Sequence, residues 1–104
     1  MTNETSPNVG TKLMFENERV RVWDLALAPG ESLATHLHRD DFLFIVVHGG
    51  SLQHVAEDNP NNVNAVRYED DQVVFIEAGG GVVHNRLVNV GDTPYRNFVI
   101  ELKR

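Results

Sequence analysis

Residues Gly30–Gly49 read GESLATHLHRDDFLFIVVHG, and this stretch decides the fold. It starts at a Pro-Gly turn, carries two histidines separated by one residue, and continues as an apolar run into a Gly-Gly turn. On a β-strand, residues i and i+2 point to the same face. His36 and His38 are therefore predicted to lie close enough to bind one metal ion, and imidazole nitrogen suits Zn, Fe, Ni and Cu. The alternative is a pair of solvated histidines in an acidic surface loop.

The rest of the chain has the pattern of short strands joined by turns. No segment shows the 3.6-residue periodicity of a helix over ten or more residues. The strand Phe42–Val47 is apolar at every position, which predicts burial on both faces. The sequence predicts an all-β domain, an antiparallel barrel or jelly roll, over residues 13–104, preceded by a polar arm at residues 1–12. Strands are predicted at 20–28, 32–38, 42–47, 51–55, 65–69, 72–76, 82–88 and 95–102.

Length, charge and cysteine content exclude several classes of protein. The 104 residues make a single domain. A net charge of −6 argues against a protein that binds the phosphates of nucleic acid. The absence of cysteine excludes disulfides and thiolate metal ligands. Residues 1–10 are polar, and no apolar run is long enough to span a bilayer, so we predict a cytoplasmic protein without a membrane partner.

The spacing of histidines and glycines resembles the first motif of the cupin family. That motif is a glycine, five residues, His-x-His, three or four residues, a glutamate, six residues and a glycine. Gly30, His36, His38 and Gly49 match it, whereas Phe42 occupies the position of the glutamate.

A second cupin motif, Pro-x-Gly-x-x-His followed by three residues and an asparagine, has a partial match. Gly81 and His84 take its glycine and histidine positions. Gly79 stands in place of the proline and Val88 in place of the asparagine. The resemblance extends over 18–103, most of the chain.

The resemblance implies a small barrel with a divalent metal on its inner face, usually in a homodimer. Without the glutamate, three neutral imidazoles remain as the implied ligands, those of His36, His38 and His84. Three-histidine iron sites occur among cupin-like dioxygenases, such as acetylacetone dioxygenase and the cysteine dioxygenases. We expect barrel closure to bring the two histidine-bearing strands face to face. We also expect metal affinity to fall as the pH drops through the histidine range near 6.5.

Carboxylates and aromatic residues next to the histidine pair are further candidates for the site. Asp40 or Asp41 would supply a fourth ligand if the strand bulges, and would otherwise form a solvated turn. Phe42 and Phe44 have the parity of His38, so they are predicted to line the interior, either as substrate contacts or as core.

The remaining candidates lie further from the histidine pair. Arg86 follows His84 by two residues and is predicted to face inward, where it would bind a substrate carboxylate unless a bulge turns it to solvent or it pairs with Glu101. His48 and His54 are predicted at the surface or at strand ends. Trp23 is predicted in the core or in a dimer interface.

Three hypotheses for function remain open at this stage. The first is a three-histidine Fe2+ dioxygenase acting on a small carbonyl or carboxylate compound, since neutral ligands favour an anionic substrate. The second is a redox-neutral isomerase, decarboxylase or lyase that uses Zn2+, Mn2+ or Ni2+. The third is a non-enzymatic module that binds a small ligand. A homodimer is predicted in each case, because the apolar strand and the sheet edges need cover.

Overall fold

A computed structural model describes residues 8–56, 59, 61, 63–79 and 81–103. This part of the chain is all-β and contains no helix, so no helix there is long and apolar enough to cross a membrane. Its strands are β1 (Lys12–Glu16), β2 (Val20–Leu27), β3 (Ser32–Leu33), β4 (His36–His38), β5 (Asp41–His48), β6 (Gly50–Val55), β7 (Val63–Tyr68), β8 (Val73–Ile76), β9 (Val82–His84), β10 (Arg86–Asn89) and β11 (Tyr95–Leu102).

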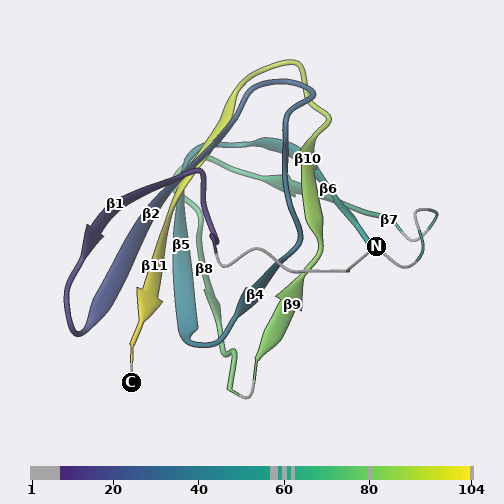
Figure 1. The fold of residues 1–104 in the computed structure, drawn as a ribbon. Helices are drawn as coiled ribbons and strands as arrows, with labels where there is room; N and C mark the ends of the chain where they lie inside the picture. Colours follow the sequence, from purple (N-terminus) through teal and green to yellow (C-terminus); the bar gives the residue numbers. More distant parts are fainter. Residues whose placement is uncertain (1–7, 57–58, 60, 62, 80, 104) are drawn as a thin grey trace.

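The strands form three antiparallel sheets (Figure 1). A five-stranded sheet has the order β1-β2-β11-β5-β8, and a four-stranded sheet has the order β3-β10-β6-β7. The strands β4 and β9 pair with each other as a two-stranded ribbon. The predicted antiparallel barrel of the jelly-roll type is therefore confirmed. Two predicted strands are each split in two, 32–38 into β3 and β4, and 82–88 into β9 and β10.

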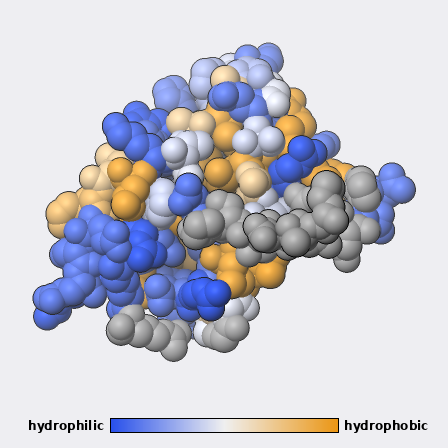
Figure 2. All heavy atoms as spheres, viewed as in Figure 1, coloured by the Kyte–Doolittle hydropathy of each residue, from blue (hydrophilic) through white to orange (hydrophobic). Residues whose placement is uncertain are grey.

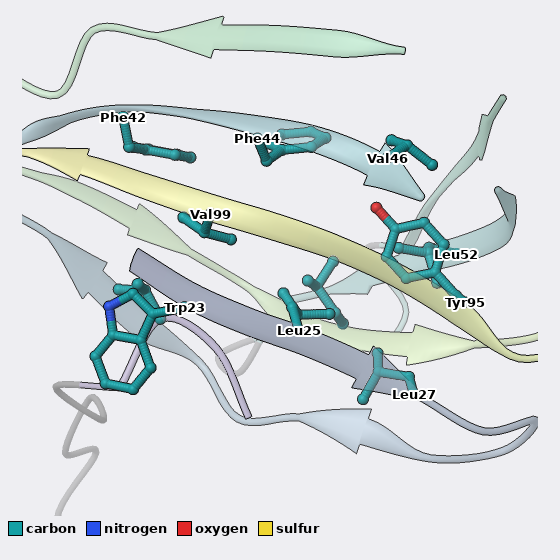
Figure 3. Packing of buried hydrophobic residues seen from close by; sticks show 11 residues of the cluster. Trp23, Leu25, Leu27, Phe42, Phe44, Val46, Leu52, Tyr95 and Val99 are labelled. Carbon is teal, nitrogen blue, oxygen red and sulfur yellow. The ribbon is translucent and has the colours of Figure 1, made fainter. Parts of the chain in front are cut away.

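The hydrophobic core lies on the inner face of the five-stranded sheet (Figure 3). Alternate residues of β2, β5 and β11 point inward, as the period of two requires. Leu52 of β6 and Leu87 of β10 pack against them from the four-stranded sheet. The buried hydrophobic residues of the three central strands are Trp23, Leu25, Leu27, Phe42, Phe44, Val46, Tyr95 and Val99.

The two faces of β5 differ in burial. Phe42 and Phe44 are buried, with 2% and 5% of their surface exposed, so their predicted inward position is confirmed. The prediction that this strand is buried on both faces is wrong. The alternate residues Leu43, Ile45 and Val47 are only half-buried, because no described element packs on the outer face of this sheet.

The strand β1 was not among the strands predicted from the sequence. Lys12–Glu16 pairs with β2 through a bulge between Leu13 and Phe15, and all its residues are exposed. Val9, inside the predicted arm, is buried in the core with 1% exposure. The described end of the arm therefore packs on this barrel, whereas residues 1–7 lie outside the described residues.

Two glycines are required by close approach or by backbone conformation. A Cβ atom at Gly49 would lie 2.2 Å from the carbonyl oxygen of Tyr68, a distance that no side chain tolerates. Gly81 has a φ of +101°, which lies in the region that favours glycine. This turn leads directly into β9, so the glycine sets the direction from which His84 enters the site.

A buried polar contact joins β2 to the C-terminal end of β11. The indole Nε1–H of Trp23 donates a 2.7 Å hydrogen bond to Oε1 of Glu101. Arg21 also contacts this oxygen, at 3.3 Å, and Glu101 is 4% exposed. Trp23 is 7% exposed and belongs to the core, which is one of its two predicted positions.

We predict that Glu101→Ala lowers the free energy of unfolding by about 1–3 kcal/mol, because it leaves the buried indole N–H without an acceptor. Glu101→Gln keeps an oxygen at this position that can accept the hydrogen bond, so its free energy of unfolding should fall by less. Urea denaturation followed by the fluorescence of Trp23, the single tryptophan of the chain, measures both variants. Equal stability of Glu101→Ala and the wild type would contradict the role of this contact.

Candidate metal centre

The ribbon of β4 and β9 places three histidines on one face. His36 pairs directly with His84 in the antiparallel register, and His38 pairs with Val82. Directly opposite residues in such a pair share a face, as do residues i and i+2 of one strand. The two strands are hydrogen-bonded neighbours, so the expectation that they face each other across the barrel is wrong.

Two of the three separations between the imidazole nitrogens match those between ligands of one metal ion. Nε2 of His36 lies 3.1 Å from Nε2 of His38 and 3.1 Å from Nδ1 of His84. The ligand atoms of the three residues all lie within 4.8 Å of one another. Ligands at about 2.0–2.2 Å from one ion are themselves about 3.0–3.5 Å apart. His36, His38 and His84 therefore form a group that could hold a metal ion.

Contacts behind the cluster orient two of the rings. Nδ1 of His36 lies 2.9 Å from the carbonyl oxygen of Ala34, so the Nδ1–H donates there and the lone pair of Nε2 points toward the other two histidines. The ring of His38 stacks on Phe42, with centroids 3.7 Å apart and planes inclined by 11°. Nδ1 of His38 is buried and has no hydrogen-bond partner among the described residues. On the Nδ1 side, stacking on Phe42 therefore orients His38 where no hydrogen bond does.

Burial keeps the three imidazoles neutral. It lowers the pKa of His38 to about 3, with a smaller effect from His36. It lowers the pKa of His84 to about 3, with smaller effects from His36, His54 and His38. The pKa of His36 is also lowered by burial, against the opposing effects of the Ala34 hydrogen bond and Glu101. Neutral imidazole is the form that binds metal.

Neither aspartate next to the histidine pair joins the cluster. The group of potential ligands in the described chain contains the three histidines alone. Oδ1 of Asp41 accepts a 2.8 Å hydrogen bond from the backbone N–H of Ala78, which ties the start of β5 to the turn before β9. The structure therefore gives no support to a fourth ligand from Asp40 or Asp41.

The expected inward position of Arg86 is wrong. Asn85 separates β9 from β10 and shifts the alternation by one residue. Leu87 consequently points into the core with 3% exposure, and Arg86 is exposed. This is the outcome that a bulge after His84 was expected to produce.

His54, predicted at the surface or at a strand end, is the next-to-last residue of β6 but is not a surface residue. It lines the interior cavity beside His84, with ring centroids 5.1 Å apart. Burial lowers its pKa. A signal was present, because His54 follows the buried Leu52 by two residues and so has its parity on β6. His48 is exposed, as predicted.

The cavity next to the histidine cluster is small and mostly apolar. Its volume is about 20 Å³. Asn97 donates a 2.7 Å hydrogen bond to the hydroxyl of Tyr95, and its Oδ1 is buried without a partner among the described residues. No lysine, arginine or carboxylate is among the lining residues, which are Val9, Leu25, His38, Phe42, Phe44, Leu52, His54, Tyr68, His84, Leu87, Tyr95, Asn97 and Val99.

Solved structures of other proteins share this fold. A cupin domain from Bordetella pertussis Tohama I has a TM-score of 0.76 and 21% identity, and the match covers 99% of this chain and 100% of that chain. An RmlC-like cupin family protein with a double-stranded β-helix fold from Methanocaldococcus jannaschii has a TM-score of 0.66 and 16% identity, with 99% and 87% covered. A sugar phosphate isomerase from a cupin superfamily, from Silicibacter pomeroyi, has a TM-score of 0.56 and 19% identity, with 83% and 52% covered.

These likenesses establish the architecture. No protein-family model and no curated protein sequence matches the chain. The structural matches to cupins extend over almost the full length of the chain. The chain has the cupin fold, as the resemblance implied, with a three-histidine group on the β4–β9 ribbon.

We predict that the metal-free protein loses stability as the pH falls from about 6.5 towards 4. The pKa of His38 and His84 is about 3 in the folded protein, against about 6.5 in an unfolded chain. In that range the unfolded state binds protons that the folded state does not, so the free energy of unfolding falls with pH. These low pKa values also correct the expectation that metal affinity falls near pH 6.5. Protons compete for the imidazoles of His38 and His84 only at a lower pH.

Urea denaturation in the presence of a chelator, repeated across this pH range, measures the effect. His38→Gln should reduce the pH dependence, because one buried neutral imidazole is removed. The exposed His48 supplies the matched control, so His48→Gln should leave it unchanged. If the free energy of unfolding had the same pH dependence in wild type and His38→Gln, the conclusion that His38 is buried in its neutral form would be contradicted.

Proposed function

We propose that this protein is a metal-dependent enzyme in which His36, His38 and His84 hold one divalent ion, with Fe2+ as the expected metal. We propose that it acts as a dioxygenase on a small anionic carbonyl or carboxylate compound. The observation that carries this proposal is the convergence of three neutral imidazoles in a cluster without a carboxylate. Bound Fe2+ would supply a Lewis acid with open coordination positions and an electron donor for O2.

The charge balance of the site favours an anionic substrate. Three neutral ligands leave the charge of a divalent ion uncompensated in a buried setting, which an anion entering the open positions would offset. Among the described residues, no cationic side chain lines the cavity. Arg86, which was expected to bind a substrate carboxylate, is exposed. The metal itself is therefore the proposed partner of the substrate's negative charge.

The walls of the cavity favour a substrate of few atoms. A volume of about 20 Å³ accommodates about one water molecule, far less than the pockets of drug-sized ligands. Phe42 and Phe44 supply apolar walls that exclude water from the cluster. Phe42 also holds His38 in place by stacking, so its proposed role is to position a ligand as well as to contact the substrate.

His54 is the polar group best placed to act on a bound molecule. It lies beside His84 on the cavity wall and does not belong to the three-histidine cluster. We propose that it hydrogen-bonds to the substrate and holds a proton for it. Its removal should therefore lower turnover and leave metal binding intact.

A redox-neutral reaction is the second candidate function. The structural neighbour from Silicibacter pomeroyi is named a sugar phosphate isomerase from a cupin superfamily. Isomerisation, decarboxylation or lyase chemistry with Zn2+, Mn2+ or Ni2+ would use the same three ligands. Activity that persists under strict anaerobiosis would favour this candidate, and activity that requires O2 would favour the dioxygenase. A cytoplasmic location stays a prediction for both.

We predict that the wild-type protein binds one divalent ion per chain and that His84→Ala loses most of it. The physical reason is that two imidazoles hold a divalent ion far more weakly than three. Metal analysis after dialysis gives the stoichiometry. His54→Ala is the matched control, because it removes a cavity-lining histidine outside the cluster and should retain the metal.

Oxygen uptake then tests the reaction. The Fe2+-loaded protein is assayed against a panel of diketones, thiols and hydroxy acids, with His54→Ala as the variant that retains iron. We expect uptake with at least one anionic compound, and slower uptake by His54→Ala. Full metal occupancy in His84→Ala would refute the ligand set, and iron-loaded wild type without uptake on any compound would refute the dioxygenase.

A further inference from the structure

Asn97 is a polar side chain on the inner face of the five-stranded sheet. It lies on the central strand β11, and its neighbours in register are the buried Leu25 of β2 and Val46 of β5. Many hydrophilic side chains of this chain lie on the outer surface, as Figure 2 shows for one face, and bond to water there. Asn97 is only 4% exposed. A buried amide in such surroundings costs free energy unless both its ends are hydrogen-bonded.

Only one end of this amide has a partner. Nδ2 of Asn97 donates a 2.7 Å hydrogen bond to the hydroxyl oxygen of Tyr95. Oδ1 is buried and accepts no hydrogen bond from any described residue. Turning the amide over would let the hydroxyl of Tyr95 donate to Oδ1, and would leave Nδ2 without a partner instead. In either orientation, one polar end of Asn97 is unpaired.

The other buried asparagine of the described chain, Asn89, is fully bonded. Its Nδ2 donates to the carbonyl oxygens of Leu27 and Thr93, at 2.8 and 2.9 Å. Its Oδ1 accepts a 2.9 Å hydrogen bond from the backbone N–H of Gly91. Asn89 therefore holds the turn between β10 and β11 together. Asn97 satisfies no backbone group in this way, which indicates that its amide has a different role.

The unpaired amide end belongs to a residue of the cavity at the candidate metal centre. Asn97 and Tyr95 line that cavity together with His38 and His84. One molecule in the cavity could therefore contact the histidine cluster and the amide at the same time. Burial raises the pKa of Tyr95 by more than the hydrogen bond from Asn97 lowers it, so the hydroxyl keeps its proton.

The pair of Asn97 and Tyr95 suits a neutral group that both donates and accepts hydrogen bonds. Oδ1 of Asn97 needs a donor, and the hydroxyl of Tyr95 forms no bond with a described residue other than Asn97. A hydroxyl group can serve both, in either orientation of the amide. A carboxylate could only accept. An ammonium group could only donate, and no carboxylate lines the cavity to offset its charge.

We propose that Asn97 and Tyr95 bind a hydroxyl group of the substrate, while the anionic group of the same molecule binds at the histidine cluster. This inference rests on the proposed function, because it takes an anion at the metal as given. It narrows the substrate class to hydroxy carboxylates of few carbons. The free energy lost by burying an unpaired amide end is then recovered when the substrate binds.

The stability of the protein distinguishes a ligand contact from a structural contact, and this measurement needs no metal. The double variant Tyr95→Phe/Asn97→Leu replaces both hydrogen-bonding side chains by apolar ones of similar shape. In chelator, we expect its urea midpoint to equal or exceed that of the wild type, because an unpaired buried amide end is removed. Asn89→Leu is the matched control. It removes a fully bonded buried asparagine and should lower the urea midpoint.

The affinity of the metal-loaded protein for hydroxy carboxylates tests the specificity. Calorimetric titration of the Zn2+-loaded protein compares carboxylates of three to six carbons that end in a hydroxyl with the same carboxylates without it. For at least one chain length, we expect the wild type to bind the hydroxy compound about ten times more tightly, the factor for one net hydrogen bond. Asn97→Leu should bind both compounds of that pair equally, with unchanged metal content.

The possible results separate this inference from the proposed function. If the wild type holds metal and binds carboxylates without a preference for the hydroxyl, or if Asn97→Leu keeps the preference, the inference is overturned and the metal site stands. If the wild type holds metal but binds no carboxylate, both are overturned.

If the wild type holds no metal, the proposed function is overturned and the urea midpoints decide the role of the amide. A double variant destabilised as much as Asn89→Leu would show that Asn97 is structural, for instance through a permanently bound water, and would overturn the inference as well. A double variant as stable as the wild type would support Asn97 as a ligand contact.

Discussion

The antiparallel pairing of β4 with β9 is the constraint on which the candidate site depends. Its register sets His36 opposite His84, and the pleat brings His38 to the same face. The ribbon is only three residues long on each strand, so a shift by one residue would turn His84 away from the cluster. The glycine turn before β9 and the hydrogen bond from Ala78 to Asp41 hold the entry and exit of the ribbon in place. The chemistry of the site therefore depends on backbone geometry outside it.

The alternation of side chains explains both the successes and the failures of the sequence predictions. It correctly predicted that Phe42 and Phe44 point into the barrel, because β5 is a regular strand of eight residues. Alternation gave the wrong direction for Arg86, because Asn85 lies between β9 and β10 and shifts the inward positions by one residue. No local sequence pattern indicates this shift. The spacing of the two motifs brought His36, His38 and His84 together correctly, although edge-to-edge pairing of their strands replaced the expected face-to-face arrangement.

Other features could be known only from the folded chain. The short strand β1 is exposed along its whole length, so burial left no periodic pattern in its sequence. Burial of Val9 depends on where the N-terminal segment crosses the barrel. The stacking of Phe42 on His38 depends on how β4 and β5 meet after a turn of two residues. In each case the decisive contact joins segments whose relative placement is a property of the whole barrel.

In the proposed metal site, Phe42 stands where the cupin motif has a glutamate, and this would affect the thermodynamics of metal binding. Neutral imidazoles do not compensate the charge of a divalent ion. When an anion binds beside the ion, each reduces the electrostatic cost of burying the charge of the other. Their binding free energies are then coupled, and the coupling is reciprocal. The bound anion raises the affinity for the metal by the same factor by which the bound metal raises the affinity for the anion. Occupancy of such a site responds to the supply of both partners, whereas a charge-compensating carboxylate would let the metal be retained alone.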